Sequence, residues 1–216
     1  MMINIRPHHV FEIINKPFSY VMLKVLMPNI YSPLLLETAI LVTLSKFVKA
    51  KKIFEFGTYL GIQTLNLIMN MPSSSRIWTI DFDRKSFKKA VQLKHDIPYS
   101  KFHFKNINKL AFINTPYQKR VITLKGDSNQ FNYSNYKNAF DMIYIDGGHD
   151  RRTLNSDTNY AFKILNKDIP SCIAWHDYQA SNYPKLTDYI DRLAAKYRIF
   201  YVQETHICFY LNKADI

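Results

Sequence analysis

The sequence contains little cysteine and no long uninterrupted apolar run. Its only two cysteines, Cys172 and Cys208, form no disulfide or metal-binding pattern, which favours a reduced, intracellular setting. Its longest apolar stretches, residues 18–27 and 33–44, are interrupted by charged residues and prolines, and neither reaches the roughly 20 residues that span a bilayer. The N-terminus also lacks a signal-peptide pattern. We therefore expect a cytoplasmic protein without a transmembrane segment.

Glycine is scarce as well, and two of the five glycines in the chain fall in one stretch, residues 53–64. An apolar run there leads into Gly57 and Gly61, and an apolar helical pattern follows. This order predicts a strand, a tight turn and a helix, the arrangement at which parallel α/β sheets bind nucleotide-like cofactors. Tyr59 stands where a dinucleotide-binding G-x-G-x-x-G turn has its middle glycine, and no G-K-[ST] follows, which excludes a P-loop.

Acidic residues are nearly absent between Arg84 and Lys125. This segment holds eleven lysines and arginines and a single acid, Asp96, so it carries ten of the twelve net positive charges of the chain. Such a surface attracts anions, including nucleic acid, acidic membrane or a phosphorylated substrate. A solvated basic helix is the structural alternative.

Predicted strands and helices alternate along the chain, which indicates an open, mostly parallel α/β sheet. Strands are predicted at 53–56, 77–80, 121–124, 141–145, 171–175, 199–203 and 207–211, and the last two form a hairpin. Helices are predicted at 34–48, 62–71, 84–95, 152–165 and 183–197. We expect residues 1–32 to form an N-terminal helical cap and residues 33–216 to form the main domain, with a basic insertion at 96–120.

Five predicted strands end in glycine-containing or polar clusters. In chain order these are Gly57, then Asp81, then Gly126-Asp127-Ser128, then Asp146, and finally His176-Asp177. Because ligands bind outside the carboxyl ends of the strands in such sheets, we expect these clusters to form one site. A turn without a pyrophosphate cradle, followed by an acid that can bind ribose hydroxyls, suits a nucleoside ligand without phosphate.

The segment Glu55-Phe-Gly-Thr-Tyr-Leu-Gly61 resembles the first motif of class I S-adenosylmethionine-dependent methyltransferases, and its tyrosine is typical of the catechol O-methyltransferase-like branch. Ile145-Asp-Gly-Gly-His149 and Ala174-Trp-His-Asp-Tyr178 resemble the small stand-alone sugar and macrolide O-methyltransferases. The resemblance runs from about residue 32 to residue 211. It implies a Rossmann-like, doubly wound, mostly parallel seven-stranded sheet with a C-terminal antiparallel hairpin, and methyl transfer from S-adenosylmethionine.

The resemblance also implies a place for each part of the cofactor. The glycine turn would line the methionine end, and Asp81 would bind both ribose hydroxyls. Asp127 and Ser128 would hold the amine edge of the adenine, and Asp146 would lie beneath the sulfonium. The residues expected to bind the cofactor are Glu55, Gly57, Thr58, Tyr59, Gly61, Gln63, Asp81, Phe82, Gly126, Asp127, Ser128 and Asp146.

His149 and Asp146 are the expected catalytic residues. His149 falls where the catechol enzymes carry a lysine base, and an ordinary histidine pKa near 6.5 suits the removal of a hydroxyl proton. We expect a small hydroxylated acceptor, such as a sugar or glycan component, and the basic segment also admits an anionic one. A homodimer is an open alternative to a monomer.

In metal-dependent relatives, the positions that match Asp146, His176 and Asp177 bind magnesium. His176 replaces the usual carboxylate, and magnesium tolerates imidazole poorly. The replacement makes a magnesium ion doubtful, and the sequence leaves three readings open for His176 and Asp177, in which they bind a metal, contact or support the substrate site, or have a structural role.

Two further functions stay open. The basic segment raises the alternative of an RNA methyltransferase. The motifs disfavour it, because residues 146–149 differ from the N/D-P-P-Y/F loop of N6-adenine enzymes and no lysine occupies the ends of the fourth and fifth strands. The second is a binding protein that keeps the fold without catalysis, because fold alone does not prove activity.

Overall fold

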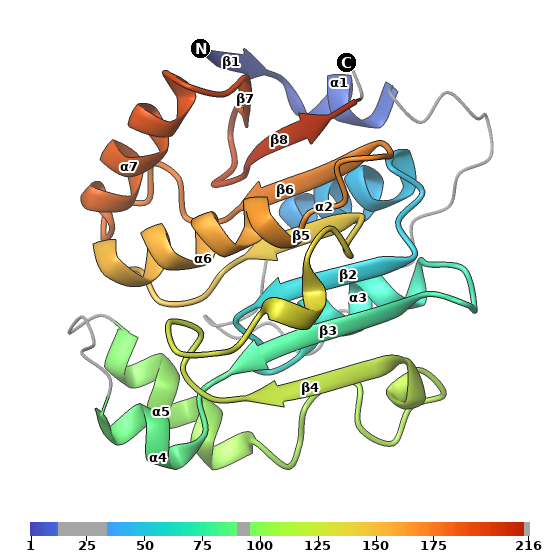
Figure 1. Cartoon of the computed structure of the whole chain (residues 1–216), viewed down its shortest axis with the longest axis vertical. Coiled ribbons are helices and arrows are strands. Elements are labelled where there is room, and N and C mark those ends of the chain that lie inside the picture. The colour runs from blue at the N-terminus through green and yellow to red at the C-terminus, as the bar shows by residue number, and fades with distance from the viewer. Residues whose placement is uncertain (13–33, 90–95, 214–216) are drawn as a thin grey trace.

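The computed structural model describes residues 1–12, 34–89 and 96–213. At its centre lies an eight-stranded sheet with the strand order β1-β7-β8-β6-β5-β2-β3-β4 (Figure 1). Its strands are β1 Met2–Ile5, β2 Lys52–Phe56, β3 Arg76–Asp81, β4 Val121–Lys125, β5 Met142–Ile145, β6 Ser171–Trp175, β7 Ile199–Val202 and β8 Cys208–Asn212. Only β8 runs antiparallel to its neighbours, β6 and β7.

Helices cover both faces of this sheet, with α6 and α7 on one face and α2 and α3 on the other (Figure 1). Helices α4 and α5 lie beyond the carboxyl ends of β3 and β4. The helices are α1 Pro7–Glu12, α2 Leu35–Phe47, α3 Ile62–Met69, α4 Arg84–Lys89, α5 Asp96–Asn106, α6 Arg151–Ile164 and α7 Pro184–Ala194, with short 3₁₀ turns at Gln118–Arg120 and Ser134–Tyr136.

The central strands are apolar throughout because both of their faces are buried. Along β2, Ile53 packs with α2 and α3. Phe54 and Phe56, which point to the other face of the sheet, pack with α6 and α7. Tyr144 and Ile145 of β5 divide between the two layers in the same way. Successive side chains of a strand point to opposite faces, so one short apolar run supplies both layers of the core.

The order in which strands are added to the sheet reverses at β2, although β2 and β5 run parallel. From β2 the chain adds β3 and β4 on one side, and β5 then pairs with the opposite edge of β2. Gly57 follows β2 and Asp146 follows β5, at the switch point where such sheets bind ligands. A Cβ at Gly57 would lie 2.0 Å from the carbonyl oxygen of Asp146, and the φ of Gly57 is +94°. Only glycine satisfies both conditions.

The fold differs from the sequence prediction in the number of strands and in the structure of segment 96–120. The sheet has eight strands where seven were expected, because Met2–Ile5 pairs in parallel with β7 instead of belonging to a helical cap. The predicted helix 152–165 and the strand 171–175 are confirmed within one residue at each end. The segment 96–120, expected as a basic insertion with no helix assigned to it, begins with the helix α5. Any helix within residues 13–32, and the end of the helix expected at 84–95, lie outside the described residues.

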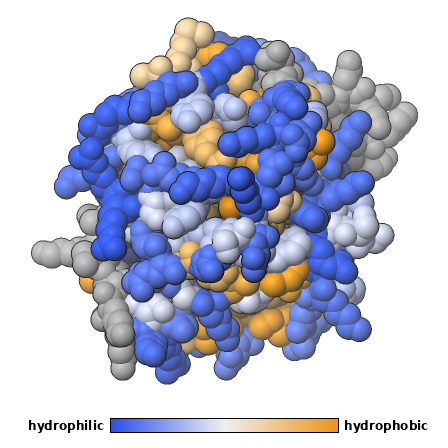
Figure 2. Space-filling model, viewed as in Figure 1, coloured by the Kyte–Doolittle hydropathy of each residue, from blue (hydrophilic) through white to orange (hydrophobic). Residues whose placement is uncertain are grey.

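Hydrophilic residues cover most of the face that Figure 2 shows. No helix in the part of the chain described has both the length and the apolar character that a membrane crossing requires.

One acid, Glu55 of β2, lies in the core behind the glycine turn. Its side chain is 1% exposed, and its Oε2 accepts hydrogen bonds from the hydroxyls of Thr64 on α3 and Thr79 on β3, the latter at 2.6 Å. Burial raises the pKa of Glu55 to about 8, although both hydrogen bonds oppose the shift. The group therefore holds a proton in the folded state at neutral pH.

This proton makes stability depend on pH. Between about pH 4.5 and 8 the folded state keeps a proton on Glu55 that the unfolded chain loses, so the free energy of unfolding falls as pH rises, by up to about 1.4 kcal/mol per pH unit. We expect Glu55→Gln to flatten this dependence, since an amide oxygen still accepts from both threonines. Urea unfolding between pH 5 and 8 measures the slope. The exposed Glu204→Gln is the control, and an unchanged slope in Glu55→Gln would contradict the assignment.

A second prediction concerns Gly57. Gly126 also has a positive φ, +144°, but a Cβ there would meet nothing within 4 Å. Alanine therefore strains the backbone at both positions but collides only at Gly57. We expect Gly57→Ala to lower the free energy of unfolding by about 1–3 kcal/mol more than Gly126→Ala. Chemical denaturation of the two variants tests this, and equal losses would show that the β2–β5 contact can relax.

Candidate active site

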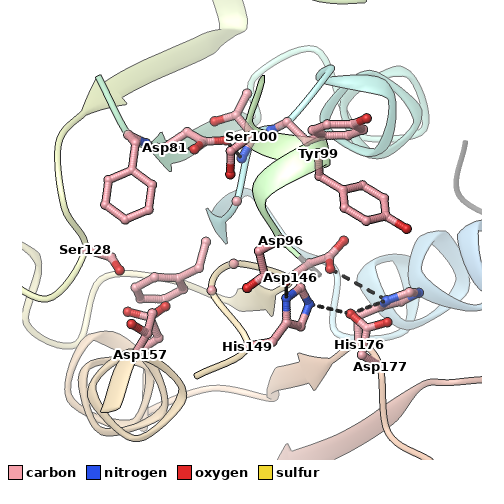
Figure 3. A pocket seen from close by; sticks show the side chains of 18 of the residues that line it. Asp81, Asp96, Tyr99, Ser100, Ser128, Asp146, His149, Asp157, His176 and Asp177 are labelled. Carbon is pink, nitrogen blue, oxygen red and sulfur yellow. Dashed lines mark hydrogen bonds and ion pairs between the residues drawn. The ribbon is translucent and has the colours of Figure 1, made fainter. Parts of the chain in front are cut away.

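The carboxyl ends of the parallel strands open into a cavity of about 790 Å³. Its volume lies within the usual range for small-molecule sites. Residues after β2, β3, β4, β5 and β6 line it, together with α5 and the loop that precedes α7. Figure 3 shows Ser128 and Asp157 at one end of this space, and Asp96, Asp146, His149, His176 and Asp177 gathered at the other.

The glycine turn after β2 is held by Asp81 at the end of β3. Oδ2 of Asp81 accepts hydrogen bonds from the backbone N–H groups of Thr58 and Tyr59, at 3.0 and 2.8 Å. Tyr59 has a φ of +46°, a conformation that costs a non-glycine residue energy and needs such support. Asp81 thus organises the turn, and its oxygens keep further lone pairs that can accept hydrogen bonds from a ligand.

Helix α5 connects the turn with the opposite end of the cavity. Nδ1 of His103 donates to the carbonyl oxygen of Tyr59 at 2.6 Å. At the first residue of the helix, Oδ1 of Asp96 lies 3.0 Å from both Nδ1 of His149 and the hydroxyl of Tyr183. The rings of His149 and Tyr183 stack with centroids 3.9 Å apart. The orientation of His149 is therefore fixed by two elements distant in sequence.

His149 is bound by a carboxylate on each side. Its Nε2 lies 2.7 Å from Oδ2 of Asp177, opposite the contact with Asp96. Burial alone would lower the pKa of His149, but the hydrogen bonds with Asp177 and Asp96 outweigh it and raise the pKa to about 10. His149 is therefore an imidazolium near neutral pH, so the expectation of an ordinary pKa near 6.5 is wrong, whereas its role as a base stays a prediction.

His176 and Asp177 extend this network to β5 and α2. Nδ1 of His176 lies 3.2 Å from Oδ2 of Asp177 and 3.6 Å from Oδ1 of Asp146. Burial favours the neutral form of Asp177, but His176 and His149 hold its pKa well below the usual range. Burial instead raises the pKa of Asp146, although His176 opposes the shift. The hydroxyl of Tyr144 donates to Asp146 at 3.0 Å.

Glu37 supports His176 from behind. It lies in the first turn of α2 and is 2% exposed. Its Oε2 lies 2.9 Å from Nε2 of His176, and its Oε1 accepts from the backbone N–H of His206 at 2.7 Å. Burial favours protonation of Glu37, but the contact with His176 outweighs it, and the pKa of Glu37 lies below its usual value. A buried carboxylate thus holds the imidazole in one orientation.

Most of the predicted site residues do meet in this cavity. Of the expected cofactor ligands, Gly57, Thr58, Tyr59, Gln63, Asp81, Phe82, Gly126, Asp127, Ser128 and Asp146 line it, as do His149, His176 and Asp177. Glu55 and Gly61 do not. Glu55 lies behind the turn, and a Cβ at Gly61 would lie 2.7 Å from the ring of Phe112, so both residues shape the turn from its far side.

The lining or supporting residues that were not predicted from the sequence include Glu37, Asp96, Asp157 and Tyr183. Two of them carried a signal. Asp96 is the only acid in the basic segment, and Glu37 interrupts an apolar run. Asp157 is 1% exposed, and burial raises its pKa to about 8. No local pattern distinguishes Asp157 or Tyr183 from ordinary helix and loop residues.

The cavity is acidic, in contrast with the basic segment beside it. Seven aspartates and one arginine, Arg152, are among its lining residues. No lysine or arginine of segment 84–125 is among the described residues that line it. The seven aspartates outnumber the cationic groups, which are Arg152 and the imidazoles of His149 and His176, and such an excess of carboxylates favours a cationic ligand.

The same fold occurs in solved methyltransferase structures. An O-methyltransferase from Bacillus cereus in complex with SAH shares 18% identity, with a TM-score of 0.56, over 85% of this chain and 82% of that chain. The SAH-bound Podospora anserina methyltransferase PaMTH1 shares 14% identity, with a TM-score of 0.56, over 85% and 80%. Spermidine synthase from Thermotoga maritima also matches, with 13% identity and a TM-score of 0.57, over 83% of this chain and 60% of that chain.

At these identities the structures establish the fold alone, and no curated protein sequence matches the chain. The family is established by a different comparison. The profile of a methyltransferase domain matches residues 54–178, which include the glycine turn, Asp81, Asp146 and the His176-Asp177 pair. The chain therefore belongs to this methyltransferase domain family.

Proposed function

We propose that this chain is an S-adenosylmethionine-dependent O-methyltransferase that acts on a small hydroxylated acceptor, such as a sugar or glycan component. The observation that carries the proposal is the cavity itself. The glycine turn and Asp81 lie along the same space as the carboxylate–imidazole cluster at its other end. A donor and an acceptor can therefore be held side by side, as transfer between them requires. Solved neighbours with SAH bound support this choice of donor.

The cavity wall also contains polar atoms that suit this donor. Oε1 of Gln63 accepts from the hydroxyl of Thr38 at 3.0 Å, while its buried Nε2 has no hydrogen-bond partner among the described residues. Near Ser128, the buried Oδ1 atoms of Asn129 and Asp157 also lack a partner there. Buried polar groups are normally paired. An amide donor beside the turn suits a carboxylate, and acceptors beside Ser128 suit the amine of adenine.

In the proposed reaction S-adenosylmethionine supplies a methyl group on a cationic sulfonium. Gly57, Thr58 and Gln63 would hold its methionine end, and Asp81 would hold its ribose. The aspartates of the cavity favour its positive charge. The protein aligns donor and acceptor, and effective molarities of this kind supply much of the rate enhancement in transfer reactions.

The acceptor would lie at the end formed by Asp96, Asp146 and His149. The loop that follows Asp177 adds neutral polar side chains to this cavity, including Gln179. Neutral polar side chains of this kind can form hydrogen bonds with the hydroxyl groups of an acceptor. Since Arg152 is the only arginine or lysine among the described lining residues, we propose a neutral acceptor in place of an anionic one. His149 remains our proposed base, and it can accept a proton only when it is neutral.

Cofactor binding is the first test. We expect isothermal titration to show binding of S-adenosylhomocysteine, and Asp81→Ala to weaken it at least about tenfold, since Asp81 holds the turn and can bind a hydroxyl through a charged hydrogen bond. Asp83→Ala removes the same charge two residues away, outside the cavity lining, and should leave the affinity unchanged. Absence of heat with the unaltered protein would refute the proposal.

The pH dependence of turnover tests His149. A base with a pKa of about 10 is mostly protonated at pH 7, and its neutral fraction rises about tenfold per pH unit below that value. We expect kcat/KM for SAH formation to rise between pH 7 and 9 with the best acceptor from a panel of sugars and catechols. His149→Gln should lose this rise. A rise that persists unchanged in His149→Gln would assign proton removal to another group.

A further inference from the structure

One buried nitrogen beside the glycine turn lacks a hydrogen bond. It is Nε2 of His103, on α5, which has no partner among the described residues, although the whole residue is only 4% exposed. Buried polar groups are normally paired. Since His103 is among the residues that line the cavity, a ligand bound in the cavity can supply the missing partner.

The contact with the glycine turn fixes the orientation of this ring. Nδ1 of His103 lies 2.6 Å from the carbonyl oxygen of Tyr59, which can only accept a hydrogen bond. Nδ1 therefore carries a proton, and Nε2 of the neutral ring presents a lone pair. The partner that suits this lone pair is a hydroxyl or an N–H group of the ligand.

This lone pair lies near Asp81, which would hold the ribose of the donor. Nδ1 of His103 is 4.0 Å from Oδ2 of Asp81, and a single ring carbon separates Nδ1 from Nε2. The two hydroxyls of a ribose are on adjacent carbons. One ribose can therefore reach two neighbouring acceptors, one on each of these residues.

Asp81 has little capacity left for two ligand hydroxyls. Its Oδ2 already accepts from the backbone N–H groups of Thr58 and Tyr59, and its Oδ1 accepts from the N–H of Phe82 at 2.7 Å. A carboxylate has about four lone-pair sites, so most of them are used within the chain. The remaining capacity is on Oδ1 and suits one hydroxyl.

We propose that Oδ1 of Asp81 and Nε2 of His103 each accept a hydrogen bond from one of the two ribose hydroxyls of the donor. The family resemblance assigned both hydroxyls to Asp81, whereas the hydrogen bonds of the folded chain divide them between β3 and α5. This inference rests on the proposed function, because it concerns the same donor. It makes His103 a ligand-binding residue as well as a support of the glycine turn.

The test is a calorimetric titration of the full chain with S-adenosylhomocysteine and with its 2′-deoxy and 3′-deoxy analogues. Each analogue lacks one hydroxyl, so we expect both to bind the unaltered protein more weakly. Loss of a hydrogen bond to an uncharged acceptor should raise Kd about 3- to 10-fold, and loss of the bond to the charged Asp81 should raise it at least about 10-fold.

Two substitutions separate the two nitrogens of His103. Asparagine can keep an N–H near the position of Nδ1 but has no atom at Nε2, whereas glutamine can place its amide oxygen near Nε2. We expect His103→Asn to weaken S-adenosylhomocysteine about 3- to 10-fold and to bind one deoxy analogue as tightly as S-adenosylhomocysteine itself, because the missing hydroxyl has no partner in this variant. His103→Gln should restore the difference.

His9→Asn makes the same change at an exposed residue of α1, outside the cavity lining. It is the control and should leave all three affinities unchanged. Circular dichroism verifies that each variant folds.

If the losses of both analogues are the same in His103→Asn as in the unaltered protein, His103 holds no hydroxyl and the inference falls, while the donor proposal stands. An analogue that binds the unaltered protein as tightly as S-adenosylhomocysteine would also overturn it. If adenosine binds with this dependence on His103 and S-adenosylhomocysteine does not bind, the ribose site stands and the proposed function falls. If neither binds, both fall.

Discussion

The site depends on the close approach of two strand ends. The backbone after β2 lies so near the carbonyl of Asp146 that a methyl group at Gly57 has no room. This contact places the glycine turn and the acid after β5 on either side of the switch point, and the ends of the neighbouring strands follow from the register of the sheet. Asp81 then closes the turn from β3 through its backbone amides. The cavity is a consequence of how the parallel strands end.

Charge balance explains why the cluster at the far end of the cavity is buried at all. A carboxylate removed from water costs several kcal/mol unless it is paired. Here Asp177 lies between two imidazoles, and His149 lies between two carboxylates. Because each charged group lies next to groups of the opposite charge, these groups stay charged although they are partly buried. The same alternation makes the protonation of His149 a property of the whole cluster, because each group sets the charge of its neighbours.

The sequence alone could predict the helices that cover the two faces of the sheet, seven of the eight strands and the edge of the sheet at which the site forms, but not helix α5. These follow from local apolar periodicity and from the polar residues at strand ends. It could not predict β1, since Met2–Ile5 becomes a strand only by pairing with β7, almost 200 residues later. Nor could it predict the pKa of His149, which depends on Asp96, 53 residues away. The local signals at Glu37 and Asp96 indicated unusual residues without indicating their partners.

Helix α5 also acts as a spacer. Asp96 touches the cluster, and His103 touches the glycine turn. The two are seven residues apart, which is almost two turns and about 10 Å of helix, so they project from nearly the same side. The number of helical residues between Asp96 and His103 therefore sets the distance between the glycine turn and His149. One inserted residue between them would lengthen the helix by only about 1.5 Å but rotate one contact about 100° away from the other. The number of residues in this part of α5 is consequently as constrained as their identity.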